Sequence, residues 1–143
     1  MRGDDEPKVS VIIPTYQEGR YIGSLLRRLA GLKYPTEIIV VDSGSTDGTV
    51  ETAKLFTENV YKINQRGIAK ARNYGACRSN GEILIFLDAD VTPPSDFVEK
   101  TLRAFQNSMV VGATCNIVPR QPRILELFFF GFYNKLIQVS TFL

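Results

Sequence analysis

The sequence contains no histidine among its 143 residues. This absence excludes Ser-His-Asp and Cys-His catalysis, and it excludes the zinc sites that depend on histidine ligands. Any metal ion must therefore be bound by oxygen atoms. Oxygen ligands favour a hard cation such as Mg²⁺ or Mn²⁺.

Cysteine is scarce as well. Cys77 and Cys115 lie far apart in the chain and form neither a metal-ligand pair nor a disulfide framework, so we expect a reducing compartment. The first residues, MRGDDEPK, are polar and rich in acids, which is not typical of a signal peptide. We therefore expect a cytoplasmic protein, with a place at the inner face of the membrane left open.

The formal net charge is only +2, which is too small to indicate a protein that binds nucleic acid. Hydrophobic residues make up 44% of the chain and charged residues 22%, as in an ordinary globular protein. A chain of this length can form one domain with a buried core.

Hydrophobic runs and helical patterns alternate along the chain. Short apolar runs predict strands at 9–13, 37–41, 59–63, 82–87 and 109–118. Apolar residues at helical spacing predict helices over 18–32, near 49–57, over 67–79 and after the PPSDF segment at 93–97. This alternation predicts an α/β fold with a mainly parallel sheet and helices on both faces.

Polar residues follow three of the predicted strands. The first strand runs into PTYQE (14–18), the second into Asp42, and the fourth into Asp88 and Asp90. Ligands of parallel α/β sheets bind at the carboxyl ends of the strands. We therefore expect these three clusters to meet at one edge of the sheet and to form the functional site.

Asp88 and Asp90 are separated by one small residue, Ala89. On an extended segment, residues i and i+2 point to the same side, so both carboxylates are expected to face one point. A divalent cation there would relieve their repulsion and bridge to phosphate oxygens. An isolated DxD motif is more often a pair of solvated loop acids, but its position after an apolar strand, opposite Asp42, favours the cation.

Asp42 ends a buried strand, where a carboxylate can accept hydrogen bonds from a ribose or a base. A dinucleotide-binding dehydrogenase also has an acid at this point, but its first turn requires glycines that PTYQEG lacks. For Ser45, Thr46 and Asp47, a plain turn and helix start is the better interpretation.

Lys70 and Arg72 lie near the start of the predicted helix at 67–79. The helix dipole does not favour cations there, which indicates an anionic partner such as a diphosphate. A solvated basic face explains Lys70 about as well, and Arg72 less well.

Four motifs occur in this order along the chain: VSVIIPTYQE, IIVVDSGSTDGT, RGIAKARNYGA and IFLDAD. Together they resemble the family-2 glycosyltransferases with the Rossmann-like GT-A fold, and dolichyl-phosphate-mannose synthases in particular. The resemblance covers the chain from Val9 to about Val118. It implies a GT-A core at 1–118 that binds a nucleotide sugar. It also implies an inverting enzyme that transfers sugar from a UDP- or GDP-sugar to an unknown acceptor.

The resemblance also implies roles for individual residues. Asp88 would face both the ribose and the metal ion, Mg²⁺ or Mn²⁺, and Asp90 would be the main metal ligand. Family members often have a second acid after the residue matching Asp42, where this chain has Ser43, and we expect this change to be tolerated. The nucleotide would be bound by Pro14, Thr15, Tyr16, Glu18, Asp42, Lys70, Arg72, Asn73 and Asp88.

No residue of the chain matches the general base of the family, which deprotonates the acceptor hydroxyl. The acids after Asp90 are Asp96, Glu99 and Glu126, and none of them fits. Two interpretations remain. The chain is the donor-binding half of a longer enzyme, or it is a non-catalytic or membrane-associated module that binds a nucleotide sugar.

Residues 119–143 are predicted to form an apolar helical segment of the same domain, leading to a missing acceptor-binding part. Asn134, Lys135 and Gln138 interrupt it, so it is too short and too polar to span a membrane. Three partners would explain its apolar surface: absent C-terminal residues, a second copy of the chain contacted through 124–143, or a membrane that carries a lipid-linked acceptor. The first is preferred.

Overall fold

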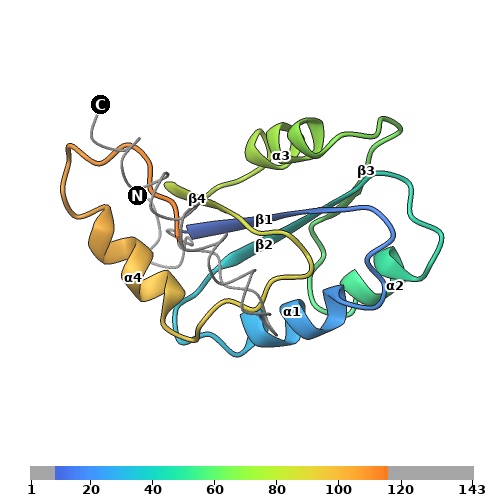
Figure 1. The fold of residues 1–143 in the computed structure, drawn as a ribbon, viewed down its shortest axis with the longest axis horizontal. Coiled ribbons are helices and arrows are strands. Elements are labelled where there is room, and N and C mark those ends of the chain that lie inside the picture. Colours follow the sequence, from blue (N-terminus) through green and yellow to red (C-terminus); the bar gives the residue numbers. More distant parts are fainter. Residues whose placement is uncertain (1–8, 116–143) are drawn as a thin grey trace, which may run out of the picture. The chain divides into compact units, whose positions relative to one another are not determined.

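The structure, a computed structural model, describes residues 9–115 of the chain. The chain divides into two compact units, residues 1–99 and residues 100–143. The first unit contains a four-stranded sheet and three helices (Figure 1). Helix α4 (Phe97–Ala104) runs across the boundary between the units. The predicted helical segment at 119–143 lies outside the described residues.

All four strands belong to one parallel sheet with the order β3-β2-β1-β4. The strands are β1 (Val9–Thr15), β2 (Glu37–Asp42), β3 (Val60–Lys62) and β4 (Ile83–Phe86). β1 is buried along its whole length and β2 along nearly all of it, which explains their unbroken β-branched runs. Thr15 pairs with Asp42, so the two central strands end at the same level.

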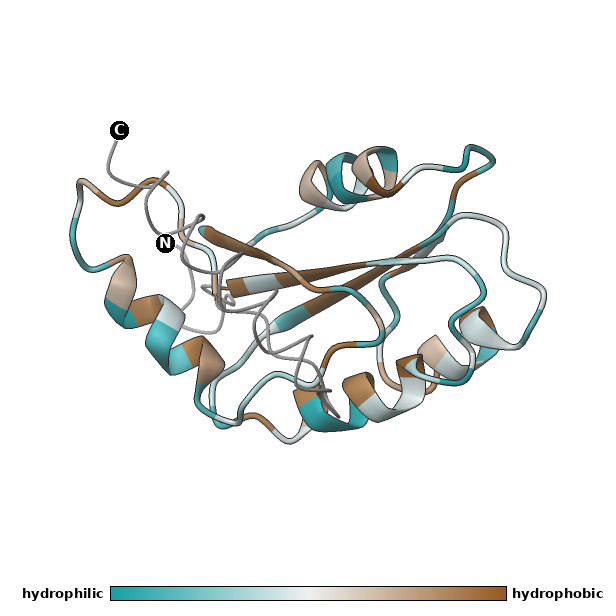
Figure 2. Ribbon diagram, in the orientation of Figure 1, coloured by the Kyte–Doolittle hydropathy of each residue, from teal (hydrophilic) through white to brown (hydrophobic). Residues whose placement is uncertain are grey.

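Helices cover both faces of the sheet, as the alternating pattern predicts. Helix α3 (Ile68–Ala76) lies on one face, and α1 (Ile22–Ala30) and α2 (Thr49–Ala53) lie on the other (Figure 1). Figure 2 shows hydrophobic residues along the strands and hydrophobic and hydrophilic residues alternating around the helices. The buried residues of α1 repeat at helical spacing, and they are Ile22, Leu25, Leu26 and Leu29. The predicted α/β fold class is confirmed.

Helix α3 packs closely on β1 and β2. Its Ala71 is fully buried with Ile12, Ile39 and Val41 in one hydrophobic cluster. A Cβ atom on Gly75 would lie 2.5 Å from Cγ2 of Ile12 and 3.2 Å from Cγ2 of Val41. Only glycine permits this approach of the helix to the sheet.

A hydrogen-bond network joins three segments at the amino-terminal ends of the strands. Ser10 donates from Oγ to Glu37 Oε2 at 2.5 Å, and Asn80 donates to both carboxylate oxygens of Glu37, from its backbone N–H and from Nδ2. Gly81 donates its N–H to Ser10 Oγ at 2.8 Å. Burial alone would raise the pKa of Glu37, but these hydrogen bonds from Asn80 and Ser10 outweigh it and lower that pKa.

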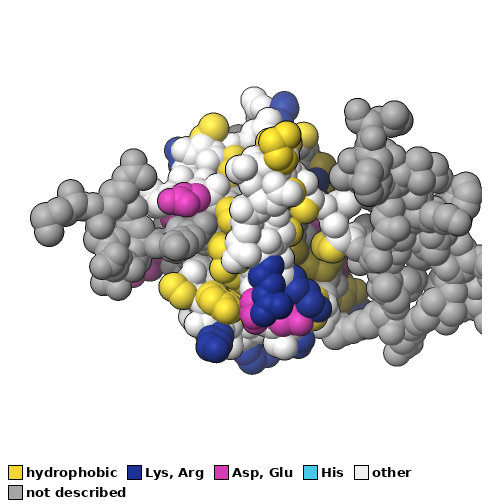
Figure 3. All heavy atoms as spheres, turned by 90° about the vertical axis from the view of Figure 1, so that its left-hand side faces the viewer, with side chains coloured by type: hydrophobic (Ala, Val, Ile, Leu, Met, Phe, Trp, Pro, Cys, Tyr) yellow, Lys and Arg dark blue, Asp and Glu magenta, His cyan; other side chains and the backbone are white. Residues whose placement is uncertain are grey.

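The face of the molecule on the left of Figure 1 is shown directly in Figure 3. Hydrophobic side chains occur there in separate groups, and basic side chains lie next to acidic ones.

One predicted strand is wrong. Residues 109–115 form no strand, and residues 116–118 of the predicted strand lie outside the described part. Met109 is 83% exposed and Val111 is 96% exposed, so this apolar run is not buried against a neighbouring strand. An apolar run predicts a strand only where a partner strand is available. The helix expected near 49–57 is also shorter, because α2 ends at Ala53 and turns follow it.

Candidate functional site

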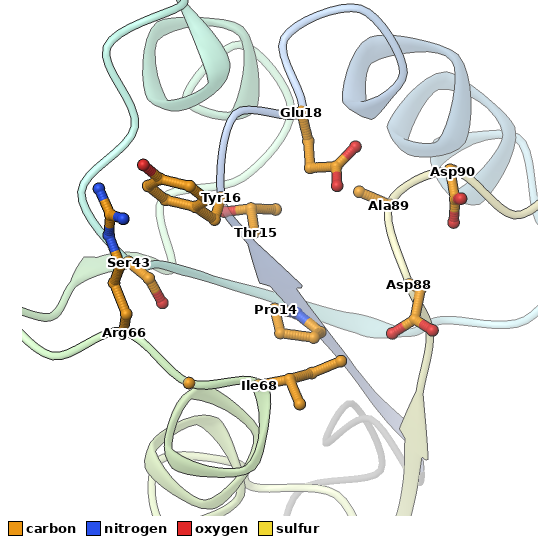
Figure 4. A pocket seen from close by; sticks show the side chains of 11 residues that line it. Pro14, Thr15, Tyr16, Glu18, Ser43, Arg66, Ile68, Asp88, Ala89 and Asp90 are labelled. Carbon is orange, nitrogen blue, oxygen red and sulfur yellow. The ribbon is translucent and has the colours of Figure 1, made fainter.

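A pocket of about 350 Å³ opens at the carboxyl ends of β1, β2 and β4 (Figure 4). Its lining comes from the loops that follow these three strands and from the loop that leads into α3. The polar clusters at the strand ends therefore lie around one cavity. The lining residues are Pro14, Thr15, Tyr16, Glu18, Ser43, Arg66, Gly67, Ile68, Asp88, Ala89 and Asp90.

The structure separates the predicted site residues into two groups. Those that line the pocket are Pro14, Thr15, Tyr16, Glu18, Asp88 and Asp90, whereas Asp42, Lys70, Arg72 and Asn73 do not line it. Five further residues line the pocket without being predicted site residues, and they are Ser43, Arg66, Gly67, Ile68 and Ala89. Arg66 and Gly67 open the RGIAKARNYGA motif, so the signal lies in the residues that lead into the helix as well as in the helix itself.

Tyr16 and Arg66 form one wall of the pocket. The Cζ atom of Arg66 lies 4.4 Å from the centre of the Tyr16 ring, which is a cation–π contact. Tyr16 is 39% exposed, and Figure 4 shows both side chains on the same side of the opening. An aromatic ring held in this way offers a flat surface on which a base can stack.

Asp42 lies beneath the loop after β2 (residues 43–48, the second loop) and not in the pocket. Its side chain is completely buried, and its carboxylate accepts a hydrogen bond from Thr15 Oγ1 at 3.1 Å. Three further hydrogen bonds reach it from the N–H of Gly44 and from the N–H and Oγ of Ser45. With four donors around it, this carboxylate fixes the loop at 43–45 and the end of β1.

The predicted extended geometry of Asp88 and Asp90 is wrong. The N–H of Val91 donates to the carbonyl of Asp88 at 3.3 Å, so the chain turns at Ala89 and Asp90. Ala89 is buried and lines the pocket, instead of pointing away from it. The two carboxylates therefore lie one before the turn and one within it, and both border the pocket (Figure 4).

Three carboxylates nevertheless border the pocket, those of Glu18, Asp88 and Asp90. Burial raises the pKa of Glu18, and nearby negative charges raise it further, with Asp90 contributing most, then Asp47 and then Asp88. Within residues 9–115, no three acidic, cysteine or histidine side chains are close enough together to hold a metal ion as they stand. The donor atoms are all oxygens, which suits a hard divalent cation once the side chains converge.

Arg72 contacts Asp88 from the side of α3. Its Nη2 lies 2.8 Å from Asp88 Oδ1, and both side chains are partly exposed. Its Nε is buried and has no hydrogen-bond partner among the described residues. Arg72 therefore acts on the pocket through Asp88.

Lys70 and Asn73 lie in a second, shallower hollow of about 640 Å³. Lys70 donates from Nζ to Gln65 Oε1 at 2.8 Å. The hollow is lined by Lys62, Ile63, Asn64, Gln65, Lys70, Asn73, Tyr74 and Cys77. These two predicted nucleotide ligands are therefore apart from the pocket that holds the acidic residues.

Within residues 9–115, no helix is both long enough and apolar enough to cross a membrane.

The family model for glycosyl transferase family 2 matches residues 10–131 of this chain. Among curated proteins, the chain is 41% identical over 103 residues to the glycosyltransferase AglE of Haloferax volcanii, a match that covers 66% of this chain and 34% of that protein. It is 32% identical over 139 residues to a dolichol-phosphate mannosyltransferase of Pyrococcus furiosus, covering 91% of this chain and 38% of that protein.

Solved structures with the same arrangement include residues 1–349 of TarS from Staphylococcus aureus in complex with UDP. That match has a TM-score of 0.66 and 27% identity, and covers 79% of this chain and 38% of the other. The mannosyltransferase PcManGT of Pyrobaculum calidifontis, solved with GDP-Man and Mn²⁺, matches with a TM-score of 0.62 and 28% identity over 87% of this chain and 38% of the other. The chain spans between about a third and two fifths of the length of these four proteins.

Proposed function

Because this chain belongs to glycosyl transferase family 2 and has the GT-A fold, we propose that its pocket binds a UDP- or GDP-sugar for transfer of the sugar to an acceptor hydroxyl. The observation that carries this proposal is the pocket itself. It places an aromatic–cation wall and three carboxylates around one cavity at the carboxyl ends of the strands. This is where ligands of parallel α/β sheets bind.

The nucleotide is assigned to the side of the pocket formed by Tyr16 and Arg66. The ring of Tyr16 is partly exposed and held by the guanidinium group, and Pro14 and Ile68 add apolar surface beside it. Stacking on an aromatic side chain is worth about 1–3 kcal/mol per base. Ser43 lies on the same cavity and can contact a polar edge of the base.

The diphosphate and its cation are assigned to the acidic side. Asp90 would hold Mg²⁺ or Mn²⁺, with Asp88 and Glu18 as further oxygen donors. A divalent cation bound there neutralises the negative charge that develops on the leaving nucleoside diphosphate. The related structure of PcManGT contains Mn²⁺ together with GDP-Man, which supports this assignment.

The remaining predicted site residues enter the proposal indirectly. Asp42 holds the second loop, and Arg72 orients Asp88. Lys70 and Asn73 line the neighbouring hollow, and the assignment of the nucleotide does not depend on them. No described residue is assigned as the general base.

The acceptor is proposed to be lipid-linked, because one relative is a dolichol-phosphate mannosyltransferase. A lipid acceptor would require the protein to work at the inner face of the membrane. Transfer to a water-soluble or polysaccharide hydroxyl is the alternative, since the relatives include proteins that act on other acceptors, such as the poly(ribitol-phosphate) transferase TarS.

Calorimetric titration of the 143-residue chain with UDP, GDP, UDP-glucose and GDP-mannose, each with and without Mn²⁺, tests the donor site. We expect one nucleotide series to bind, and to bind more tightly with Mn²⁺. ATP at the same concentration is the control for unspecific phosphate binding. Failure of all four ligands to bind would overturn the proposal. Analysis of products with a panel of acceptors then separates a transferase from a non-catalytic module that only binds the nucleotide sugar.

A further inference from the structure

Three consecutive backbone N–H groups of the loop after β1 (residues 16–21, the first loop) donate to side chains of the loop after β2 (residues 43–48, the second loop) and of Thr49, the first residue of α2. Gln17 donates to Ser45 Oγ at 2.8 Å, and Glu18 donates to Thr49 Oγ1 at 2.9 Å. Gly19 donates to Asp47 Oδ2 at 2.8 Å. The GSTDGT segment is thus more than the plain turn and helix start that the sequence predicts.

Asp47 connects two of these three contacts. Its Oδ1 accepts from Thr49 Oγ1 at 2.5 Å and from the Thr49 N–H at 3.2 Å, while its Oδ2 accepts from Gly19. A hydroxyl has one proton, so Thr49 gives it to Asp47 and offers a lone pair to the N–H of Glu18. The carboxylate therefore fixes Gly19 directly and Glu18 through Thr49. The hydrogen bonds from Thr49 and Gly19 also lower the pKa of Asp47.

The two loops touch closely at this point. A Cβ atom on Gly19 would lie 2.5 Å from the carbonyl oxygen of Asp47 and 3.1 Å from its Oδ2. Thr49 is completely buried, so its hydroxyl has no access to water as an alternative partner. The contact therefore joins an exposed carboxylate to a buried hydroxyl at the start of α2.

Hydrogen bonds between the two loops hold Gln17 in an unusual backbone conformation. Its φ is +57°, the only positive φ of a residue other than glycine in the described part of the chain. Such a conformation is unfavourable for residues other than glycine and persists where neighbouring contacts hold it. Its side-chain oxygen accepts from the N–H of Thr46 at 2.8 Å. Tyr16 and Glu18, on either side of this residue, both line the pocket (Figure 4).

We propose that Asp47 is a positioning residue, which holds the Glu18 backbone through Thr49 and Gly19 so that the Glu18 carboxyl faces the acidic side of the pocket. This inference rests on the proposed donor site and deepens it. Asp47 itself does not line the pocket. It determines how much Glu18 contributes to the binding of the cation and diphosphate.

The test compares Asp47→Ala and Thr49→Val with the control Glu51→Gln, which changes another exposed acid of the same segment. For each variant, the affinity for UDP and GDP is measured with and without Mn²⁺. We expect Asp47→Ala and Thr49→Val to reduce the gain in affinity that Mn²⁺ provides by about tenfold, because each removes a hydrogen bond that orients Glu18. Without Mn²⁺, the affinities of Asp47→Ala and Thr49→Val for UDP and GDP should change little. The affinities of Glu51→Gln should change little with or without Mn²⁺.

A double-mutant cycle with Glu18→Gln distinguishes positioning from a general loss of structure. If Asp47 acts through Glu18, Asp47→Ala has no further effect on the gain from Mn²⁺ in the Glu18→Gln background. An equal loss in both backgrounds, or an unchanged gain in Asp47→Ala and Thr49→Val, would overturn the proposal. Thr49→Val keeps the shape of the side chain, so it replaces Asp47→Ala in this cycle if Asp47→Ala does not fold.

Amide hydrogen exchange of the ligand-free protein gives an independent measurement. Exchange at Glu18 and Gly19 should become faster in Asp47→Ala and remain slow in Glu51→Gln. Unchanged exchange would refute the role of Asp47 whatever the ligand is. If the wild-type chain binds neither UDP nor GDP but the exchange result holds, the proposed function fails while the contact between the loops stands.

Discussion

Arg72 donates a hydrogen bond from Nη2 to Oδ1 of Asp88 at 2.8 Å, so the first acid of the IFLDAD motif is held by a cation from α3. Asp90, two residues further on, lies within the turn and is exposed at the pocket. Two acids that look equivalent in the sequence are therefore in different environments. Asp88 is oriented by a neighbour, whereas Asp90 is available to a cation.

Replacement of Asp90 by asparagine should abolish the dependence of nucleotide binding on Mn²⁺. The side chain keeps its shape but loses the negative charge that a hard cation requires. The free energy of unfolding should change by less than about 0.5 kcal/mol, because the residue is exposed. Calorimetry with and without Mn²⁺ measures the first effect and urea denaturation the second. Metal-dependent binding that survives intact would remove Asp90 from the metal site.

The pairing of Arg72 with Asp88 predicts that the two residues act together. Arg72→Gln and Asp88→Asn should each weaken binding of the Mn²⁺–nucleotide complex, and the double variant should be little worse than Asp88→Asn alone. Both side chains are partly exposed, so solvent screens the ion pair and its effect on stability should stay below about 1 kcal/mol. Dissociation constants for the four proteins complete the cycle. Independent, additive losses would show that Arg72 binds the ligand by itself.

Asp42→Ala should destabilise the protein and loosen the second loop. The donors of Thr15, Gly44 and Ser45 would lose their acceptor, and of these the Thr15 hydroxyl is buried, so that leaving it unsatisfied costs about 1–3 kcal/mol. Free UDP or GDP should lose as much affinity as the intact sugar nucleotide, because the loop frames the nucleotide and not the sugar. Denaturation and calorimetry at a temperature where the variant is folded check both points. A loss confined to the intact donor would contradict this reading.

Gly75→Ala should reduce the free energy of unfolding, although alanine favours a helix. Overpacking of a core costs about 1–3 kcal/mol, and the added methyl group meets the β-branched side chain of Ile12, which has little freedom to move. The intrinsic gain from alanine in a helix is about 1 kcal/mol and offsets only part of this. The matched control is Gly112→Ala, where no atom lies within 4 Å of the added Cβ. Equal stability of the two variants in urea denaturation would show that α3 can move away from the sheet.

Glu37 predicts a dependence of stability on pH. Its pKa is lower in the folded protein than the ordinary value of 4.5, so it stabilises the fold above that value. This contribution disappears as the pH falls through the folded pKa and the carboxyl takes up a proton. Between about pH 5 and pH 3, Glu37→Gln should therefore lose stability less steeply than the wild type. Urea denaturation across this range measures the slope, and parallel slopes would rule out the linkage.

The fold could be predicted from the sequence because burial on both faces leaves a strong pattern. Val9–Ile13 and Glu37–Val41 are nearly unbroken apolar runs, and the α1 residues repeat at helical spacing. Met109–Cys115 shows where the method fails, since the same kind of run is exposed. Hydrophobicity along a sequence does not reveal whether a partner strand exists.

The site could be predicted only in part. Topology places Thr15, Asp42 and Asp88 at one edge, and this requires no knowledge of side-chain directions. The direction of each carboxylate depends on local turns, such as the one closed by Val91 and Asp88, and a sequence pattern does not contain that information. The contacts of Asp47 with Gly19 and Thr49 are of the same kind.

The order β3-β2-β1-β4 has a consequence for how the protein is made. β4 is the last described strand of the sheet to be synthesised, yet it pairs with β1, the first. Val9 can therefore form this pairing only after Ile83 has been synthesised. Until β4 has been made, the edge of β1 that pairs with it has no partner strand. Asp88 and Asp90, which follow β4, are also not yet beside the loop after β1. Such distant pairing slows folding and leaves a strand edge open to other chains. A ribosome-bound or truncated chain that ends before β4 would thus be prone to aggregation, and the pocket at the strand ends would form late, as a sign that the sheet has closed.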